Sequence, residues 1–443
     1  MNPLEISELG EIIRKVRRSR GLTLTDLADE NISQATISNI ERGVPHVHPD
    51  KVHYLLRKLE IEDKLSDLMT GEQRELKQIK FRLFMVESLL RVEDVDQADK
   101  QLENIVLIDD HPYAAHYYWL KGKILISRRK WKRAERALYN AIRLANQNPY
   151  GHQSNIEACS FSELGLCFYY QNDLEGALRF TESGLDAFNE EGERLHTKYT
   201  LLRNKAIYLE RMGRLAEALK VVQDVWDELP QITEVETVLV FYWLRAELLR
   251  RTSLLDEAES YALKGLDLAM INQSYFSMFD LWTVLGSIYM ARKSWEEAES
   301  CFELALNIKD KIPYKEIMIT TCTRLGILYI QMKKWEEARE TLDLAIQLGE
   351  KYDNAPRLTE ALLITGDLYR SQNRIFEAIP FYERAVALAK KHKYKKQEHQ
   401  AWFRLARCWD GKNEKEFEKC TRNMYIIQRE LEPKKVIDIE SMG

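Results

Sequence analysis

Residues 282–302 read WTVLGSIYMARKSWEEAESCF, and residues 322–342 read CTRLGILYIQMKKWEEARETL. In both stretches a glycine is followed by a tyrosine three residues later, a tryptophan nine residues later and an alanine twelve residues later. The combination of a small residue and an alanine twelve positions on occurs seven times: Gly122/Ala134, Gly165/Ala177, Ala206/Ala218, Ala246/Ala258, Gly286/Ala298, Gly326/Ala338 and Gly366/Ala378. From residue 206 onwards the small residues are 40 positions apart, which indicates one structural unit repeated along the chain.

Each repeat is predicted to form two helices. The small residue lies in the first helix, where it permits the second helix to approach closely, and the large apolar residue nine positions later begins the second helix. Acidic residues such as Glu296 and Glu297 then fall in the first turn, where they interact favourably with the helix dipole. This pattern closely resembles the tetratricopeptide repeat, whose helix pairs stack into a superhelix.

The composition agrees with a helical protein of more than one structural unit. The chain has 443 residues, of which 45% are hydrophobic and 30% are charged, with only 18 glycines and 10 prolines. A formal charge of −5 excludes a protein that coats nucleic acid through bulk positive charge, so any DNA contact must be local. No apolar stretch approaches the roughly 18 to 20 residues of a membrane-spanning helix, no export signal precedes the first helix, and the six cysteines include no CxxC pair. We therefore expect a cytoplasmic protein with no membrane partner, no metal and no other cofactor.

Residues 1–65 lack the repeat. They contain four short amphipathic stretches, at 8–19, 23–30, 33–42 and 49–59, which predict a compact helical domain. The apolar positions expected to form its core are Leu9, Ile12, Ile13, Val16, Leu24, Leu27, Ala28, Ile37, Ile40, Val52, Leu55, Leu56 and Leu59.

Within this segment, residues 22–43 read LTLTDLADENISQATISNIERG. Thr23 with Asp26, and Ser33, fit helix N-caps, and Gly43 fits a helix end. The stretch resembles the helix-turn-helix of phage Cro and repressor-type proteins, in which a recognition helix enters the major groove of DNA. The predicted DNA-binding residues are Thr23, Ser33, Gln34, Ala35, Thr36, Ser38, Asn39 and Arg42. The fold class is therefore predicted to be all-α, an N-terminal helix-turn-helix domain followed by an α-solenoid of about 8–9 tetratricopeptide-like helix pairs.

The outer face of the recognition helix is expected to read bases. With Ile37 and Ile40 packed inward, Gln34 and Asn39 face outward, and each can make two hydrogen bonds to an adenine edge. Ala35 can contact a thymine methyl group.

Other residues of this domain are expected to hold the DNA backbone or the fold. Thr23 and Ser33 stand at helix starts, where hydroxyl and backbone N–H groups suit phosphates. The resemblance to the repressors implies an internal ion pair between Arg17 and Glu41. The remaining candidates for backbone contacts are Arg14, Lys15, Arg18, Arg20 and Arg42. Residues 1–65 hold 10 Lys and Arg against 11 Asp and Glu, so the electrostatic affinity for DNA should be modest, and dimerisation could offset this.

Stacked helix pairs create a concave surface, which the free positions of the first helices line. Positions six and three before each small residue, and one and four after it, should point into this groove. Arg203 and Arg250 are expected to pair with a peptide carboxylate, and Trp243 is the expected apolar contact. The predicted peptide-binding residues at these positions are Thr200, Arg203, Glu210, Trp243, Glu247, Arg250, Asp280, Thr283, Thr323 and Asp367.

A repressor-like domain followed by long tetratricopeptide-like repeats resembles the RRNPP family of Gram-positive regulators, which are receptors for short secreted peptides. Length and repeat count are most similar to the neutral protease regulator branch, and the repeats are also similar to those of Rap proteins. In that family an asparagine of the first repeat helix holds the peptide backbone. Asn204, two residues before Ala206, matches this pattern, whereas Arg324 and other residue types stand there in other repeats.

The resemblance implies a transcriptional regulator that binds a double-stranded DNA operator and is controlled by a short signalling peptide held in the concave groove, as in quorum sensing. We expect a homo-oligomer, dimeric or tetrameric. The predicted domains are a helix-turn-helix domain at 1–65, a linker helix at 66–80, and a peptide-binding and dimerisation domain at 81–443. The alternative is a protein-interaction regulator that sequesters a response regulator or another signalling protein through its repeats, with DNA binding secondary. The chain has no phosphate-binding loop, no HExxH and no GxSxG, so no catalytic residue is predicted.

Overall fold

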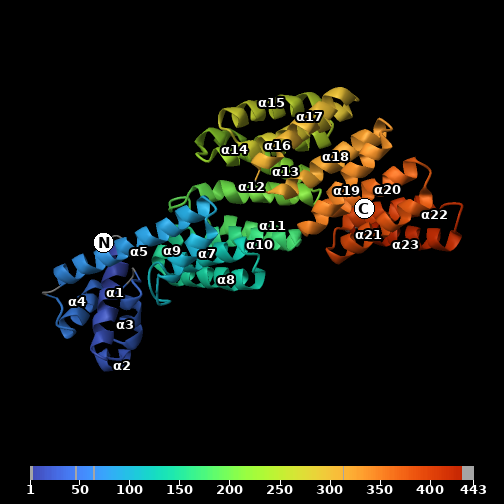
Figure 1. The fold of residues 1–443 in the computed structure, drawn as a ribbon. Helices are drawn as coiled ribbons and strands as arrows, with labels where there is room; N and C mark the ends of the chain where they lie inside the picture. The colour runs from blue at the N-terminus through green and yellow to red at the C-terminus, as the bar shows by residue number, and fades with distance from the viewer. Residues whose placement is uncertain (1–2, 45–46, 63–64, 313, 432–443) are drawn as a thin grey trace, which may run out of the picture. The chain divides into compact units, whose positions relative to one another are not determined.

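The computed structural model describes residues 3–44, 47–62, 65–312 and 314–431. Within these ranges the chain forms α-helices, three short 3-10 helices and no β-strand longer than a single bridge, so the predicted all-α fold is confirmed (Figure 1). The last twelve residues of the predicted repeat domain, 432–443, lie outside the described residues. The chain divides into two compact units: residues 1–171 with 175–204, and residues 172–174 with 205–443.

The first unit begins with the four helices α1 (Pro3–Ser19), α2 (Leu24–Leu27), α3 (Gln34–Glu41) and α4 (Pro49–Lys58). They enclose a small apolar core, as the sequence predicts. Its buried members are Leu9, Ile12, Ile13, Leu27, Ile32, Ile37, Ile40, Leu55, Leu56, Leu59 and Ile61. The predicted core residues that are only partly buried pack against this cluster: Val16, Leu24, Ala28 and Val52.

The second helix is shorter than predicted, since α2 ends at Leu27 rather than near residue 30. The side chain of Asp29 explains the early end. Its carboxylate accepts hydrogen bonds from the backbone N–H groups of Asn31 and Ile32, at 2.8 and 3.0 Å. A short polar side chain that bonds the following backbone in this way turns the chain and competes with helix formation.

A long helix, α5 (Leu65–Arg91), follows and contains the predicted linker segment 66–80. It packs against α1 and against the first repeat helices, α6 and α7, within the first unit. The repeat helices are α6 (Val95–Glu103), α7 (Ala114–Ser127), α8 (Trp131–Gln147), α9 (Pro149–Ser154), α10 (Ile156–Tyr170), α11 (Leu174–Asp186), α12 (His196–Arg211), α13 (Leu215–Val225), α14 (Val235–Arg251), α15 (Leu255–Ile271), α16 (Tyr275–Ala291), α17 (Trp295–Asn307), α18 (Met318–Gln331), α19 (Trp335–Lys351), α20 (Ala355–Ser371), α21 (Ile375–Lys391), α22 (Lys395–Trp409) and α23 (Glu414–Leu431). The 3-10 helices are η1 (Trp226–Gln231), η2 (Lys309–Lys311) and η3 (Lys315–Ile317).

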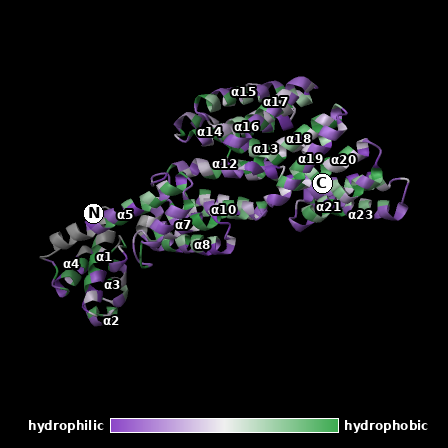
Figure 2. Ribbon diagram, in the orientation of Figure 1, coloured by the Kyte–Doolittle hydropathy of each residue, from purple (hydrophilic) through white to green (hydrophobic). Residues whose placement is uncertain are grey.

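The helix boundaries follow the repeat pattern closely. All seven large apolar residues predicted to begin a second helix do so: Trp131, Leu174, Leu215, Leu255, Trp295, Trp335 and Ile375. The alanine three residues after each of them is completely buried. Figure 2 shows hydrophobic and hydrophilic residues interleaved along the repeat helices, as expected of amphipathic helices that pack in pairs.

Gly366 shows why the first helix needs a small residue at the leading position. A Cβ atom added there would lie 2.3 Å from Cε1 of Tyr382, a side chain with no exposed surface. At the matching position of the preceding repeat, a Cβ on Gly326 would lie 2.6 Å from Cγ of Leu342. At both positions a larger residue than glycine would overlap the side chain that faces it from the second helix.

No helix in the described ranges has an apolar run long enough to cross a membrane.

Candidate functional site

The predicted recognition helix α3 starts at a side-chain cap. The hydroxyl of Ser33 accepts a hydrogen bond from the backbone N–H of Thr36 at 3.1 Å. Thr23 and Asp26 form a reciprocal capping box at the start of α2, in which the Asp26 carboxylate accepts from the Thr23 N–H at 2.8 Å. Both predicted caps are confirmed. The hydrogen bonds from the Thr23 hydroxyl and N–H lower the pKa of Asp26, so an ionised carboxylate stands beside the hydroxyl that was predicted to meet a phosphate.

The outer face of α3 carries the predicted base-reading side chains. Ile37 and Ile40 are buried, while Gln34 and Ala35 are exposed and Asn39 is half-buried. Of the other predicted contacts, Arg42 is exposed, and Thr36 and Ser38 are half-buried. The structure therefore gathers these residues on one accessible helix, and their contact with DNA stays a prediction.

Two hydrogen bonds hold the polar side chains of this face in place. The Gln34 amide donates to the Thr25 hydroxyl at 3.0 Å, and the Arg42 guanidinium donates to the side-chain oxygen of Asn39 at 2.5 Å.

The predicted ion pair between Arg17 and Glu41 is confirmed. Nε and Nη2 of Arg17 donate to the two carboxylate oxygens of Glu41 at 2.6 and 2.9 Å, and both residues are buried. The hydrogen bond to Glu41 raises the pKa of Arg17, against the opposing effect of burial. Arg17 is thus part of the domain's interior and ties α1 to α3.

Three of the other basic residues of α1 face acids of the same unit. Arg14 is buried and pairs with the carboxylate of Glu11 at 3.0 Å. Lys15 pairs with Glu75 of α5 at 2.7 Å, and Arg18 pairs with Asp110 at 3.4 Å. These neighbours reduce the positive charge that α1 can offer to a DNA backbone.

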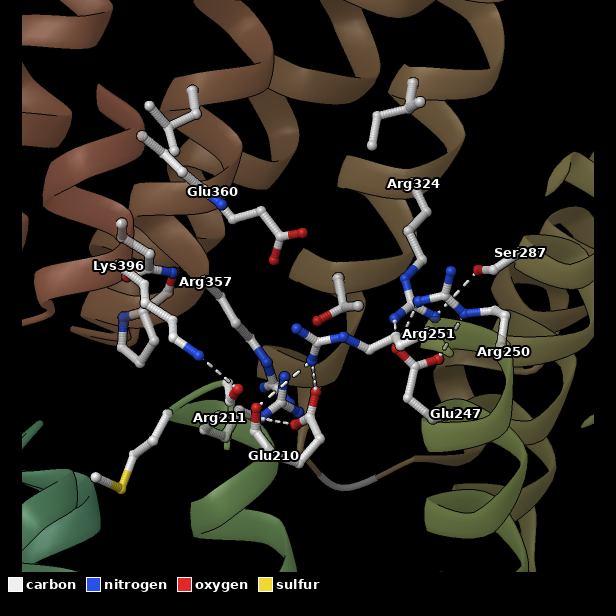
Figure 3. A pocket seen from close by; sticks show the side chains of 18 of the residues that line it. Glu210, Arg211, Glu247, Arg250, Arg251, Ser287, Arg324, Arg357, Glu360 and Lys396 are labelled. Atoms are coloured by element: carbon white, nitrogen blue, oxygen red, sulfur yellow. Dashed lines mark hydrogen bonds and ion pairs between the residues drawn. The ribbon is translucent and has the colours of Figure 1, made fainter. Parts of the chain in front are cut away.

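The second unit contains a polar pocket of about 340 Å³ (Figure 3). Its walls come from the first helices of successive repeats and from the turn after α12. The lining residues are Glu210, Arg211, Met212, Gly213, Glu247, Arg250, Arg251, Ser287, Met290, Thr320, Arg324, Ile327, Pro356, Arg357, Glu360, Leu363, Lys396, Gln397 and Gln400. Six of these side chains are cationic and three are anionic, so the lining has a surplus of positive charge that favours an anionic ligand.

Glu247 stands at the centre of one wall and joins two arginines. Arg250 donates to both of its carboxylate oxygens, at 2.7 and 2.9 Å, and Arg324 donates to one of them at 2.6 Å. Nη1 of Arg324 also donates to the hydroxyl of Ser287 at 3.0 Å. Burial alone would raise the pKa of Glu247, but the charges of Arg250 and Arg324 outweigh burial and hold it far below its ordinary value.

Glu210 is a second carboxylate of the lining that pairs with two arginines. Arg251 donates to its carboxylate at 2.6 Å, and Nε of Arg211 lies 3.4 Å from its other oxygen. The amine of Lys396 donates to the backbone carbonyl of Gly213 at 2.7 Å. Figure 3 shows these groups facing the same space as Glu247 and Arg324.

Arg357 differs from the other arginines of the pocket. Among the described residues, the only hydrogen bond of its guanidinium group runs from Nη1 to the backbone carbonyl of Glu316 at 3.1 Å, and its Nε is buried without a partner. Asp280 interacts electrostatically with Arg357, Arg211 and Arg324. Burial nevertheless dominates and raises the pKa of Asp280 to about 6.

Of the predicted peptide-binding residues, the structure brings Glu210, Glu247 and Arg250 together in the pocket. Asp280 is half-buried and does not line it. Trp243 is half-buried and packs against an apolar core cluster.

Two predicted threonines are buried and hydrogen-bond within their own helices. Thr283 donates to the carbonyl of Phe279 at 2.9 Å, and Thr323 donates to that of Ile319 at 2.7 Å. Asp367 accepts hydrogen bonds from the Tyr382 hydroxyl, at 2.7 Å, and from Arg404.

The remaining predicted residues, on the part of α12 that belongs to the first unit, are Thr200, Arg203 and Asn204. Thr200 is half-buried, and its hydroxyl donates to the carbonyl of His196 at 3.4 Å. The Arg203 guanidinium donates to the side-chain oxygen of the buried Asn204 at 3.3 Å.

The pocket also contains cations that the sequence pattern did not place in the groove: Arg211, Arg251, Arg324, Arg357 and Lys396. A signal for two of them existed. Arg211 and Arg251 both stand five residues after the leading alanine of a repeat, one position beyond those assigned to the groove. Arg324 stands at the position where the family resemblance led us to expect asparagine. No three His, Cys, Asp or Glu side chains of the described residues gather as metal ligands would.

Family models match both parts of the chain. A helix-turn-helix model matches residues 13–62, and tetratricopeptide repeat models match residues 85–149, 279–312 and 316–391. Neither kind of model is that of an enzyme. No curated protein matches the chain in sequence.

Several solved structures share the fold. A Rap protein complexed with competence and sporulation factor has a TM-score of 0.59 at 14% identity, over 80% of this chain and 99% of its own. NprR complexed with its cognate peptide NprX has a TM-score of 0.57 at 15% identity, over the same shares. The apo form of NprR from B. thuringiensis has a TM-score of 0.55 at 16% identity, again over 80% and 99%. The predicted domain types are thus confirmed by the family models, and the repeats share the fold of the Rap and NprR structures.

Proposed function

We propose that this chain, which joins a helix-turn-helix to tetratricopeptide repeats of the Rap and NprR fold, is a transcriptional regulator controlled by a short peptide. The helix-turn-helix binds an operator in double-stranded DNA. The peptide binds in the repeats of the second unit. The proposal rests chiefly on the polar pocket, whose lining carries more cationic than anionic side chains and so favours an anionic ligand.

The pocket suits a peptide in size and chemistry. A volume of about 340 Å³ accommodates a few side chains, not a folded protein. Its lining combines charged groups with Met290, Ile327 and Leu363, so it offers both ion pairs and apolar contact. NprR has been solved in complex with its cognate peptide NprX, and a Rap protein has been solved in complex with competence and sporulation factor.

The DNA-binding part of the proposal rests on α3. Gln34 and Ala35 are exposed, and the half-buried Asn39 accepts a hydrogen bond from Arg42 on the same face. A glutamine or asparagine that makes two hydrogen bonds to adenine contributes about 1–3 kcal/mol of discrimination against another base. Because residues 1–65 are nearly neutral, a homo-oligomer that presents two such domains to a two-fold operator would supply the missing affinity.

Control by the peptide follows from linkage. A peptide that binds one arrangement of the repeats more tightly than another shifts the population toward that arrangement. If the two arrangements space the DNA-binding domains differently, peptide and operator affect each other's affinity by the same factor.

The DNA-binding part is tested by selecting DNA from a random pool with the full chain. Wild type should enrich a sequence motif, and replacing Gln34 and Asn39 by alanine should lower the affinity for it at least about tenfold. A matched control replaces Gln223 and Asn307, which are exposed on repeat helices, and should bind the motif as wild type does. Failure of wild type to enrich any motif would contradict this part.

A second candidate is a regulator that sequesters a signalling protein, such as a response regulator, through its repeats. The pairing of Lys15 with Glu75 and of Arg18 with Asp110 favours it, because these contacts leave α1 with little charge for DNA. Under this candidate the variant with Gln34 and Asn39 replaced retains full regulatory activity in the cell, whereas our main proposal requires its loss.

A further inference from the structure

The guanidinium group of Arg357 is buried at the pocket and forms no ion pair with a carboxylate of the described residues. Arg357 is the third residue of α20, and only 8% of its surface is exposed. Figure 3 shows its side chain extending from α20 into the pocket toward Glu210 and Arg211. Its backbone N–H donates to the capping side chain of Asn354 at 3.3 Å, which fixes the start of the helix and therefore the direction of the side chain.

No described carboxylate pairs with Arg357. The single hydrogen bond of its guanidinium group to the described residues goes to a backbone carbonyl, and its buried Nε has no acceptor there. The carboxyl group of Asp280 interacts with it electrostatically but forms no ion pair. The other arginines of the pocket do have carboxylate partners, Glu247 for Arg250 and Arg324, and Glu210 for Arg211 and Arg251.

An arginine in this position is costly unless something else neutralises it. The guanidinium group of arginine stays protonated in proteins, so it remains charged when it is buried. Burying an ion without a partner is unfavourable by several kcal/mol, and a carboxylate that accepts two parallel N–H bonds is the best available compensation. The surplus of positive charge in the lining also favours the binding of a carboxylate in the pocket.

On the premise that the chain binds a peptide, we propose that Arg357 pairs with a carboxylate of that peptide, and that the pocket selects peptides carrying one. The carboxylate is either the C-terminus or an Asp or Glu side chain, since both present the same pair of oxygens to the guanidinium. The peptide's carboxylate thus completes a charge pairing that the chain itself leaves open.

The test uses synthetic heptapeptide pools and the full chain. One pool has free C-termini and no Asp or Glu, a second has amidated C-termini with Asp and Glu, and a third has amidated C-termini and neither acid. Retained peptides are identified by mass spectrometry after affinity selection. The third pool should not be retained. Retention of the first pool assigns the C-terminal carboxylate, and retention of the second assigns an acidic side chain.

Variants of the chain provide the second arm. Arg357→Gln should weaken binding of the selected peptides at least about tenfold, because a charge-assisted pair is lost. Arg357→Lys keeps the charge without the planar fork and should lose less. Arg374→Gln is the matched control, since Arg374 is exposed, pairs with Glu377 and lies outside the pocket. It should bind as wild type does.

The outcomes separate this inference from its premise. Retention of the third pool to the same degree as the others, or equal binding by Arg357→Gln, overturns the inference and leaves peptide binding standing. Retention of no pool by wild type contradicts peptide binding, and the inference with it. If Arg357→Gln does not fold, as judged by circular dichroism, peptide binding by Arg357→Lys and the comparison of the three pools test the inference instead.

Discussion

Replacing Glu247 by glutamine should destabilise the second unit strongly although it changes a single atom. Only 2% of the Glu247 side chain is exposed, and its carboxylate holds both Arg250 and Arg324. Glutamine keeps the shape and one acceptor oxygen, but it removes the negative charge. Arg250 and Arg324 then face each other across a largely buried space without the carboxylate that paired with both of them.

The size of the effect follows from the burial of the pair. Removing one partner of a buried ion pair costs about 3–5 kcal/mol, because an uncompensated charge remains. Since the amide still accepts one hydrogen bond, we expect the lower end, about 3 kcal/mol. The control is Glu217→Gln, which breaks the exposed pair with Arg214 at 2.5 Å, and there the cost should stay below about 1 kcal/mol.

The effect should also depend on pH with a definite sign. The pKa of Glu247 is lower in the folded state than its ordinary value of 4.5. Its contribution to stability is therefore complete above pH 4.5 and declines as the pH falls below that value, because the unfolded chain takes up a proton first. The difference in stability between wild type and Glu247→Gln should shrink accordingly in acid.

Hydrogen exchange is the appropriate measurement, because repeats can open locally without unfolding of the whole chain. Amides of α14 and α18 should lose protection in Glu247→Gln by the factor that corresponds to about 3 kcal/mol, roughly a hundredfold. The reasoning is refuted if Glu247→Gln stays within about 1 kcal/mol of wild type, or if Glu217→Gln costs as much. Combining Glu247→Gln with Arg324→Gln should cost less than the two single changes added, because the double variant no longer contains an Arg324 without its carboxylate.

Three further predictions concern other parts of the chain. Asp280→Asn should stabilise the protein above pH 6 and have no effect below pH 4 in urea unfolding, because burial raises the pKa of Asp280 to about 6 and its ionisation opposes folding. Gly366→Ala should cost about 1–3 kcal/mol in thermal unfolding through overlap with Tyr382, whereas Glu383→Ala on the exposed side of α21 should change little. The six buried cysteines should resist a thiol reagent at pH 8 until urea is added, since burial raises the pKa of Cys322, for example, to about 12; rapid labelling of the native protein would contradict this.

The repeat register was predictable because it depends on residues that are close in the sequence and recur in many repeats. A small residue with an alanine twelve positions later recurs from repeat to repeat, so each occurrence supports the assignment of the others. Gly366, which faces Tyr382, is one of these small residues. The helix starts at Trp295 and Trp335 follow from the same pattern. The early end of α2 was not predictable in this way, because it depends on one carboxylate, that of Asp29, bonding the next backbone groups instead of continuing the helix.

The binding groove was less predictable, because position on a helix does not determine a side chain's partner. Counting along the repeat placed Glu247 and Arg250 correctly at the pocket but also selected Thr283, which is buried and bonds its own helix. Arg324 was not selected because it stands two residues before Gly326, outside the four positions of each repeat that were assigned to the groove. Its long side chain reaches Glu247, which lies 77 residues earlier in the sequence. The repeat pattern does not indicate that these two side chains meet in space.

The ion pair between Arg324 and Glu247 joins α18 to α14 across the intervening repeat of α16 and α17. In a solenoid each repeat normally contacts only its neighbours, so stability is approximately a sum of adjacent interfaces. Here Lys396 of α22 also reaches the carbonyl of Gly213, 183 residues earlier. The side chains that line the pocket are thus the same ones that tie distant repeats of the second unit together. We therefore expect a ligand that changes their pairing to alter how these distant repeats of the second unit are held together.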